Sequence, residues 1–417
     1  MTQPQENFNE LKLEVLSPVG DFESLEAAVK FGADAVYLGS TMFTMRVAPE
    51  NFGDEKLKQA VDYAHENSVK VYLTCNTLPR GEELAGIYNF FENAKNAGVD
   101  AFIINDIGVL GVAKEIAPEI DVHISTQAGI VNHLTANEFY KMGAKRIVLA
   151  RELSFDEITF IRQNTPPDLE IEAFVHGAMC MSVSGRCLLS DYMVGRDANR
   201  GACAQPCRWG YHLVEEKRPG EYYQLFEDEQ GSYILNAKDM CMIEHIDLLA
   251  KSGITSLKIE GRAKSAYYVA TITNAYRNAV DIFYKNPSAY YCPDWLIRET
   301  QLVSHRRYTT GFYFGRQKDS QYYENGGYLR QCDIVGIVKQ HLNGMLYCQQ
   351  KNKFNVNDEI EILIPKQQSK KLIVQEILNE EKENIKSANH AHMYFYLKYN
   401  GENIPSGSIL RMMKKES

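Results

Sequence analysis

The segment FGADAVYLG (31–39) carries the pattern that decides the fold, and three later segments repeat it. In each copy a glycine follows an amphipathic stretch and precedes a short apolar run. A glycine there suits the left-handed position that ends a helix, and the apolar run is typical of a buried parallel strand. The other copies are AGVDAFIIND (97–106), MGAKRIVLAR (142–151) and SGITSLKIEGR (252–262).

Four further apolar runs complete a set of eight candidate strands, most of them separated by helical segments. They are LEVLSPVG (13–20), VKVYLTCN (69–76), DVHISTQAG (121–129) and LEIEAFVHG (169–177). Eight strand–helix units over about 250 residues predict an α/β fold, a (β/α)8 TIM-like barrel, with an open doubly wound sheet as the alternative. The chain has no GxGxxG or GxxxxGK[ST] segment, so nothing indicates a dinucleotide or P-loop site.

The sequence predicts the following division of the chain. Residues 1–12 form a polar N-terminal tail, and the barrel occupies 13–285 with a cysteine-bearing insertion at 178–251. A linker region follows at 286–326. From 327 to 417 the sequence changes to short alternating strands, which predict a small C-terminal antiparallel β-barrel domain.

The barrel prediction also locates the site, because sites in this fold lie at the C-terminal ends of the strands. Arg151 and His176 fall at two such ends, and Glu260 and Arg262 follow the last strand. We predict these four as catalytic or binding residues: His176 as a general acid–base, and the last pair near a phosphate position. A structural role is the alternative for each.

Glu172 is a further catalytic candidate, but it lies inside a core strand. A buried carboxylate there needs a cationic partner, and Arg151 on the neighbouring strand and Lys258 on the eighth are the candidates. The resulting pair is either catalytic or structural.

Neutral amides form a second polar group at the strand ends. Asn76, Asn105, Gln127 and Asn132 offer hydrogen-bonding edges suited to reading a flipped base. They would serve equally to satisfy the backbone of the loops.

Four clustered cysteines, Cys180, Cys187, Cys203 and Cys207, lie in the predicted insertion among serine, glycine, arginine and glutamine residues. Such a set holds either zinc or an iron–sulfur cluster, with buried apolar thiols as the alternative. Cys241 is a fifth candidate, which could replace Cys203 or Cys207 as a ligand.

The composition gives an expectation about location and partners. The chain begins with a polar, acidic segment, MTQPQENFNELK, and has no apolar run long enough to span a bilayer. We expect a cytoplasmic protein with no membrane contact, whose thiols stay reduced and free for metal. Its 54 acidic and 45 basic residues give a net charge of −9, without the basic footprint usual in nucleic-acid-binding proteins.

One long segment resembles the signature of the collagenase-like peptidases of family U32. The matching positions are Glu172, Phe174, Gly177, Cys180, Gly185, Cys187 and Ser190. CAQPCRW (203–209), LNAKDMC (235–241) and KIEGR (258–262) are also similar to the family. The resemblance runs from about residue 13 to 315, and less specifically through the C-terminal domain.

The resemblance is strongest to the branch of this family that acts in transfer-RNA hydroxylation. It implies a [4Fe–4S] cluster held by the four clustered cysteines, with zinc as the alternative. It also implies transfer RNA as substrate, 5-hydroxyuridine at the wobble position as product, prephenate as a small anionic co-substrate, and an electron donor that the sequence does not identify. Peptidase activity is the second hypothesis, although no HExxH or GxSxG motif occurs. A non-catalytic partner subunit, in which the four cysteines form a structural metal site, is the third.

Overall fold

The computed structural model describes residues 13–44, 51–179, 189–196, 202–206, 209, 212–213, 223–224, 238–315 and 329–414. Within these residues eight parallel strands form a closed barrel, because β11 (Ser256–Ile259) pairs with both β7 (Glu170–Ala178) and β1 (Glu14–Pro18). This closure confirms the predicted TIM-like barrel and excludes the open sheet. The other barrel strands are β2 (Ala35–Gly39), β3 (Lys70–Cys75), β4 (Ala101–Ile104), β5 (Asp121–Ile124) and β6 (Arg146–Val148).

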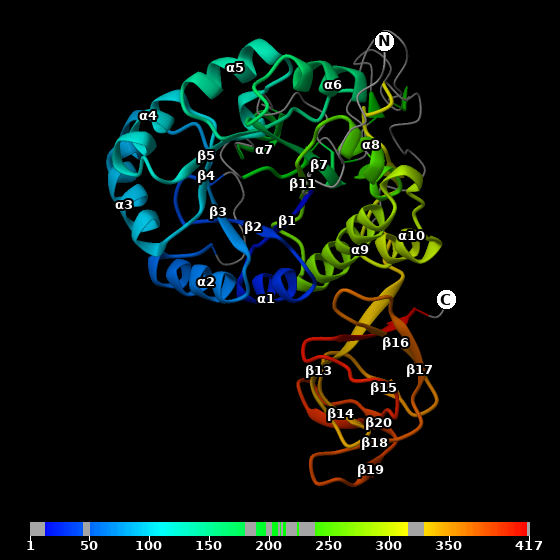
Figure 1. Cartoon of the computed structure of the whole chain (residues 1–417). Helices are drawn as coiled ribbons and strands as arrows, with labels where there is room; N and C mark the ends of the chain where they lie inside the picture. Colours follow the sequence, from blue (N-terminus) through cyan, green and yellow to red (C-terminus); the bar gives the residue numbers. More distant parts are fainter. Residues whose placement is uncertain are drawn as a thin grey trace.

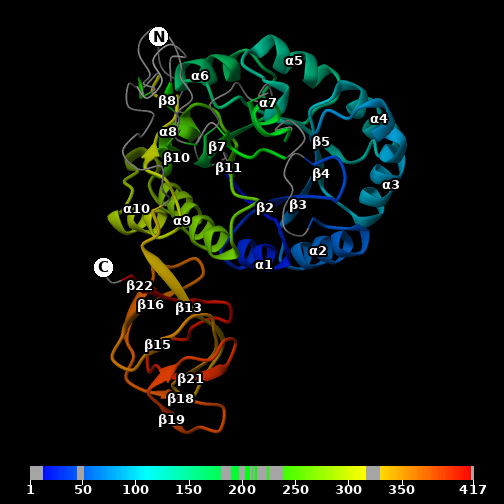
Figure 2. The ribbon, with the colours of Figure 1, turned by 180° about the vertical axis from the view of Figure 1, so that it is seen from behind.

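Helices surround the barrel and form a ring outside the strands (Figures 1 and 2). The residues Gly32, Gly98, Gly143 and Gly253 have φ angles of 101°, 86°, 91° and 86°, so each takes the left-handed conformation that the repeated pattern predicted. The helices between the strands are α1 (Phe22–Lys30), α2 (Asp54–Glu66), α3 (Ile87–Ala97), α4 (Ile107–Ile116), α5 (His133–Lys141), α6 (Phe155–Gln163) and α8 (Ile246–Lys251). Helix α9 (Ala266–Lys285) follows β11.

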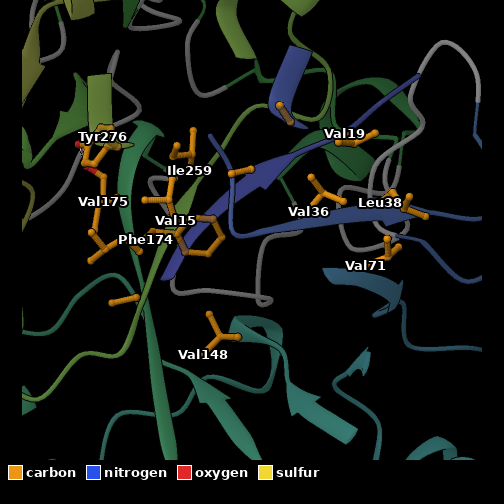
Figure 3. Packing of buried hydrophobic residues seen from close by; sticks show 14 of the residues in the cluster. Val15, Val19, Val36, Leu38, Val71, Val148, Phe174, Val175, Ile259 and Tyr276 are labelled. Carbon is orange, nitrogen blue, oxygen red and sulfur yellow. Dashed lines mark hydrogen bonds between the residues drawn. The ribbon is translucent and has the colours of Figure 1, made fainter. Parts of the chain in front are cut away.

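Apolar side chains fill the layer between the strands and the helices. Val15, Val36 and Val71 come from β1, β2 and β3 and are fully buried in this layer (Figure 3). Inside the barrel, a smaller apolar cluster comes from β1 to β4. Its members are Leu16, Ala35, Tyr37, Tyr72, Ala101 and Ile103. The interior on this side is therefore a packed core, as is usual for this fold.

The chain after β7 adds elements beside the barrel. Strand β10 (Asp239–Cys241) pairs antiparallel with β7, and β12 (Tyr308–Thr309) pairs with β10. Short helix α7 (Leu189–Val194) lies within the outline of the helical ring in both views (Figures 1 and 2). Helix α10 (Asp294–Gln301) and β12 both lie in the segment expected as a linker.

The C-terminal residues form an antiparallel β domain with its own apolar core, as predicted. A curled eight-stranded sheet has the order β17-β16-β22-β13-β14-β21-β18-β19. Its strands are β13 (Cys332–Leu342), β14 (Met345–Gln350), β16 (Glu359–Leu363), β17 (Lys370–Ile373), β18 (Ile377–Leu378), β19 (Asn384–Ile385), β21 (Tyr394–Lys398) and β22 (Ile409–Met413). A separate pair joins β15 (Phe354–Asn355) to β20 (Ser387–Ala388).

A buried ion pair joins this domain to helix α10. Arg411 on β22 lies 2.7 Å from Glu299 on α10 and 2.9 Å from Glu361 on β16 of its own domain, and its side chain is fully buried. Removing one partner from such a network leaves a buried charge unpaired, which is destabilising. Among the described helices, none combines the length and the apolar character that crossing a bilayer requires.

Candidate functional site

The N-terminal end of the barrel interior holds a network of buried charges. Arg146, the first residue of β6, contacts Glu14 and Glu170 at 2.6 Å and Glu172 at 3.0 Å. Lys258 Nζ contacts the other oxygen of Glu172 at 2.5 Å. Every charge in this group therefore has an oppositely charged partner, as a stable buried network requires.

Glu172, predicted as catalytic, lies in this network, and its partners differ in part from those expected. Lys258 is a partner, as predicted, but Arg151 is not: Arg146 takes that place. Arg146 and Glu172 meet because β6 and β7 pair in a register that sets Arg146 opposite Glu170 and Val148 opposite Glu172. Arg151 lies beyond the end of β6 and pairs with Glu260 instead. The catalytic role of Glu172 stays a prediction.

The network also sets the protonation of its members. Burial alone would raise the pKa of Glu14, but the Arg146 charge and hydrogen bonds from Arg146, Tyr72 and Ser256 outweigh it and hold that pKa below its ordinary value. His123 lies against the Tyr72 ring, with ring centroids 4.6 Å apart. Burial and the nearby cations lower the pKa of His123 well below its ordinary value, so this histidine is neutral at pH 7.

The C-terminal end of the same strands forms the mouth of the barrel, where Arg151 and Glu260 lie. The Arg151 guanidinium stacks 3.8 Å above the centre of the Phe174 ring and donates to the Ala178 carbonyl at 2.5 Å. It reaches Glu260 at 3.5 Å, and both side chains keep some solvent access. A planar guanidinium supported on an aromatic ring is well placed to bind a carboxylate or a phosphate by donating hydrogen bonds.

His176, near the end of β7, is buried among tyrosine rings of helix α9 and strand β12. Its Nδ1 and Nε2 atoms each lie 3.4 Å from a hydroxyl, of Tyr276 and Tyr308 respectively. Burial, with a smaller effect of His305 and Lys264, lowers the pKa of His176 to about 3. The ring is therefore neutral and only weakly basic at pH 7. The predicted role as general acid–base stays a prediction, and a neutral hydrogen-bonding ring is the form to expect.

Arg262 lies across the mouth toward β2 and β3. Its Nη1 donates to Thr44 at 2.6 Å and to Thr74 at 3.3 Å, and the side chain is almost fully buried. A β-carbon at Gly39 would collide with Nη2, so the arginine occupies space that only glycine leaves open. These contacts place Arg262 among the polar groups of the mouth, where it also positions the segment after β2.

The neutral amides lie at the ends of the next strands. Asn76 donates to the Ser125 hydroxyl at 3.4 Å, and the backbone N–H of Gln127 donates to the same oxygen at 3.3 Å. The amide oxygens of Asn105 and Gln127 are buried without a hydrogen-bond partner. Asn132, by contrast, caps α5 and accepts from the Thr135 N–H. The structure thus brings three of the four predicted amides together.

The predicted cysteine site lies mostly outside the described residues: Cys180, Cys187 and Cys207 are not among them, and Cys203 is. The backbone N–H of Gln205 donates to the Cys203 sulfur at 3.3 Å, and Gln205 has a φ of 58°. The neighbouring Ala204 N–H donates to Ser190 on α7. The turn thus gives the Cys203 sulfur a backbone N–H donor, an arrangement that fits a metal ligand.

The described residues add two points on metal binding. No three His, Cys, Asp or Glu side chains of the described part of the chain are grouped as they would be around a metal ion. Cys241, the alternative ligand, lies on β10 with its sulfur 4.0 Å from the Thr300 hydroxyl, and burial raises the pKa of its thiol to about 11. A thiol that resists ionisation is a poor metal ligand unless the metal itself is close.

Sequence reasoning missed three residues of the barrel interior and mouth. Arg146 binds Glu172, Phe174 supports Arg151, and Tyr308 contacts His176. A signal for Phe174 was present, because Glu170, Glu172 and Phe174 alternate along β7 and alternate residues of a barrel strand share a face. The contact with Tyr308 had no such signal, since it comes from a strand far along the chain.

Comparison with known proteins gives two family matches. The model of Peptidase family U32 matches residues 20–322, a range that begins just before helix α1 and ends beyond strand β12. The model of the Peptidase family U32 C-terminal domain matches residues 330–411.

Individual relatives match over most of their length. The tRNA hydroxylation protein P of Escherichia coli is 37% identical over 397 residues, covering 85% of this chain and 86% of the relative. The tRNA hydroxylation protein P1 of Bacillus subtilis is 33% identical, covering 97% of this chain and 95% of the relative. A collagenase of Porphyromonas gingivalis is 34% identical, covering 84% and 86%.

Proposed function

The chain belongs to peptidase family U32, and from that membership and the barrel mouth we propose that it hydroxylates a uridine of transfer RNA. The observation that carries the proposal is the similarity to two tRNA hydroxylation proteins along nearly the whole chain, both domains included. The product would be 5-hydroxyuridine at the wobble position. The polar mouth supports this assignment in two ways. Its amides are uncharged groups suited to a base, and Arg151 is a cation suited to an anionic group.

We further propose that Cys180, Cys187, Cys203 and Cys207 hold a [4Fe–4S] cluster. The turn at Cys203 supports this, since its backbone N–H is directed at the sulfur as in thiolate–metal sites. The bound cluster would supply one-electron transfer. The same turn would also suit zinc, so the metal content has to be measured.

The residues of the mouth have separate tasks in this proposal. Arg151, held over the Phe174 ring, would bind a carboxylate of a small anionic co-substrate such as prephenate. Neutral His176, held between the Tyr276 and Tyr308 hydroxyls, would stay a hydrogen-bonding ring. Arg262, with Thr44 and Thr74, would hold the segment after β2 against the mouth.

The test of the proposed function is nucleoside mass spectrometry of transfer RNA. A host that lacks its own homologue should lose 5-hydroxyuridine and regain it when this chain is expressed. Replacement of Cys203 by serine should prevent the recovery. A nucleoside profile that does not respond to this chain would contradict the proposal.

A second measurement tests the cluster. Protein purified without oxygen should be brown and should contain about four iron and four sulfide per chain. The variant Cys203→Ser should lose much of the colour, whereas Cys348→Ser, in the core of the C-terminal domain, should keep it. A colourless protein that contains zinc would show that the four cysteines form a structural zinc site and hold no iron–sulfur cluster.

Peptidase activity is the second candidate, favoured by the similarity to a collagenase. Digestion of gelatin or of fluorogenic peptides by the purified protein would support it. That result, together with an unchanged nucleoside profile, would reverse the order of the two functions.

A further inference from the structure

The ends of β3, β4 and β5 carry a group of uncharged polar side chains, Asn76, Asn105, Ser125 and Gln127. The register sets Cys75 opposite Ile104 and Ile104 opposite Ile124, so the residues that follow these strands lie next to each other. The bond from Asn76 to Ser125 joins β3 to β5 across the end of β4, where Asn105 lies. The group is thus one continuous patch of the mouth.

Two members of the patch have an unused acceptor. The amide oxygens of Asn105 and Gln127 are shielded from solvent, yet neither accepts a hydrogen bond. An acceptor left unpaired in a protein interior is unfavourable, and most such groups in folded proteins are paired. Two unpaired acceptors on adjacent strand ends indicate a missing donor at this place. The terminal torsion of an amide side chain is soft, so a small rotation would turn either oxygen toward a bound group.

The chemistry of the patch selects the kind of donor. Its members are uncharged and their unpaired atoms are acceptors, so a phosphate or carboxylate oxygen would be repelled. A pyrimidine edge fits better, because an amide offers an acceptor and a donor side by side. In uracil the N3–H would donate to the amide oxygen while O4 accepts from the amide nitrogen.

We propose that Asn105 and Gln127 determine which base enters the barrel mouth, by binding the N3–H edge of uracil. This inference rests on the proposed function and makes it more specific. A site that pairs a buried acceptor with a substrate N–H rejects an analogue without that hydrogen, since the acceptor then stays unpaired. Cytosine lacks the N3–H and should therefore bind less tightly.

The test measures the affinity of the purified full chain for two RNA hairpins that differ only in one unpaired loop base, uracil or cytosine. Fluorescence anisotropy should show the wild-type protein binding the uracil hairpin about tenfold tighter or more. The double variant N105A/Q127A should bind both hairpins within about threefold of each other. Asn93→Ala is the matched control, because this amide lies on α3 and binds Asp54 outside the barrel.

A second variant keeps the test independent of folding. Asn105→Asp retains the side-chain volume and the acceptor but removes the donor, and a carboxylate accepts from the amino group of cytosine. It should move the preference toward the cytosine hairpin. If the double variant keeps the wild-type ratio, or if the wild-type protein binds both hairpins equally, the inference is overturned.

The inference and the proposed function fail in different ways. If this chain restores 5-hydroxyuridine in the host and N105A/Q127A restores it equally well, the inference is wrong and the function stands. If the wild-type chain restores none, the proposed function itself is wrong.

Discussion

The two ends of the barrel strands differ in how their charged side chains are paired. At the N-terminal end, Arg146 of β6 contacts three carboxylates within 3.0 Å, and Lys258 of β11 pairs with one of them. At the mouth, Arg151 reaches one carboxylate, Glu260, at 3.5 Å. The Arg146 guanidinium is enclosed by anions, and the Arg151 guanidinium lies over the Phe174 ring.

This difference matches the division between a stabilising face and a site face that the fold usually shows. In this fold the N-terminal face usually serves stability, and the C-terminal face carries the site. A fully paired buried network makes its members hard to remove and leaves none of them free for a ligand. Replacing a weakly paired arginine costs little stability, and its guanidinium is available to bind an anionic ligand. Three substitutions test this contrast, from the largest expected change in stability to the smallest.

Arg146→Met should cause the largest loss. It leaves Glu14 and Glu170 without the arginine and Glu172 with Lys258 alone. Water can compensate only Glu170, because Glu14 is mostly buried and Glu172 fully buried. Removing one partner of a buried ion pair costs about 3–5 kcal/mol. Urea unfolding at pH 7 measures the change.

The control for this loss is an exposed ion pair. Lys141 and Glu138 lie 2.7 Å apart on α5, and both side chains are about two-thirds exposed. Lys141→Met should cost at most about 1 kcal/mol. Equal losses in the two variants would show that the interior network does not stabilise the barrel.

His176→Gln should change the response of stability to pH. The pKa of His176 is about 3 in the folded protein, below the ordinary value of 6.5. Between these values the unfolded chain binds more protons, so this histidine lowers stability as the pH falls below about 6.5, by about 1.4 kcal/mol per pH unit. Between pH 7 and pH 5 the wild type should lose roughly 2 kcal/mol more than the variant.

Urea unfolding at the two pH values gives this difference. His133→Gln on α5 is the matched control, because its ring packs on Phe160 outside the barrel. It gives the effect of replacing an imidazole that lies outside the barrel. If H176Q lost as much stability as the wild type between pH 7 and pH 5, the His176 ring would be protonated in the folded protein, which would reopen the role of general acid–base.

The contrast also shows which features of this molecule can be predicted from its amino-acid sequence. The barrel was predictable because the pattern of helix, glycine and strand recurs along the chain, and each copy determines the backbone conformation of its own segment. Lys258 was predictable as a partner of Glu172, since both lie on strands that must adjoin when the barrel closes. Arg146 was not, because its choice over Arg151 depends on the register of β6 against β7.

The mouth was predictable in its residues but not in its contacts. Strand ends identified Arg151, His176, Glu260 and the amides, since the fold brings all strand ends to one face. Burial then set the environment of each side chain, while the role of each stays a prediction. The His176 ring is surrounded by tyrosines and its pKa is lowered, and the amide oxygens of Asn105 and Gln127 are buried without a donor, although neither property is encoded near the residue in the chain.

Arg151→Met should cause the smallest change in stability and a large loss of function. The substitution removes one hydrogen bond to a carbonyl and one long ion pair, while the methionine side chain keeps contact with the Phe174 ring. Such losses amount to about 1 kcal/mol. Recovery of 5-hydroxyuridine in the complemented host should nevertheless fall at least tenfold, because the cation for the anionic co-substrate is gone. Arg151→Lys should recover part of it, since the charge returns without the planar fork. If R151M were as unstable as R146M, both ends of the barrel would be structural and the site would have to lie elsewhere.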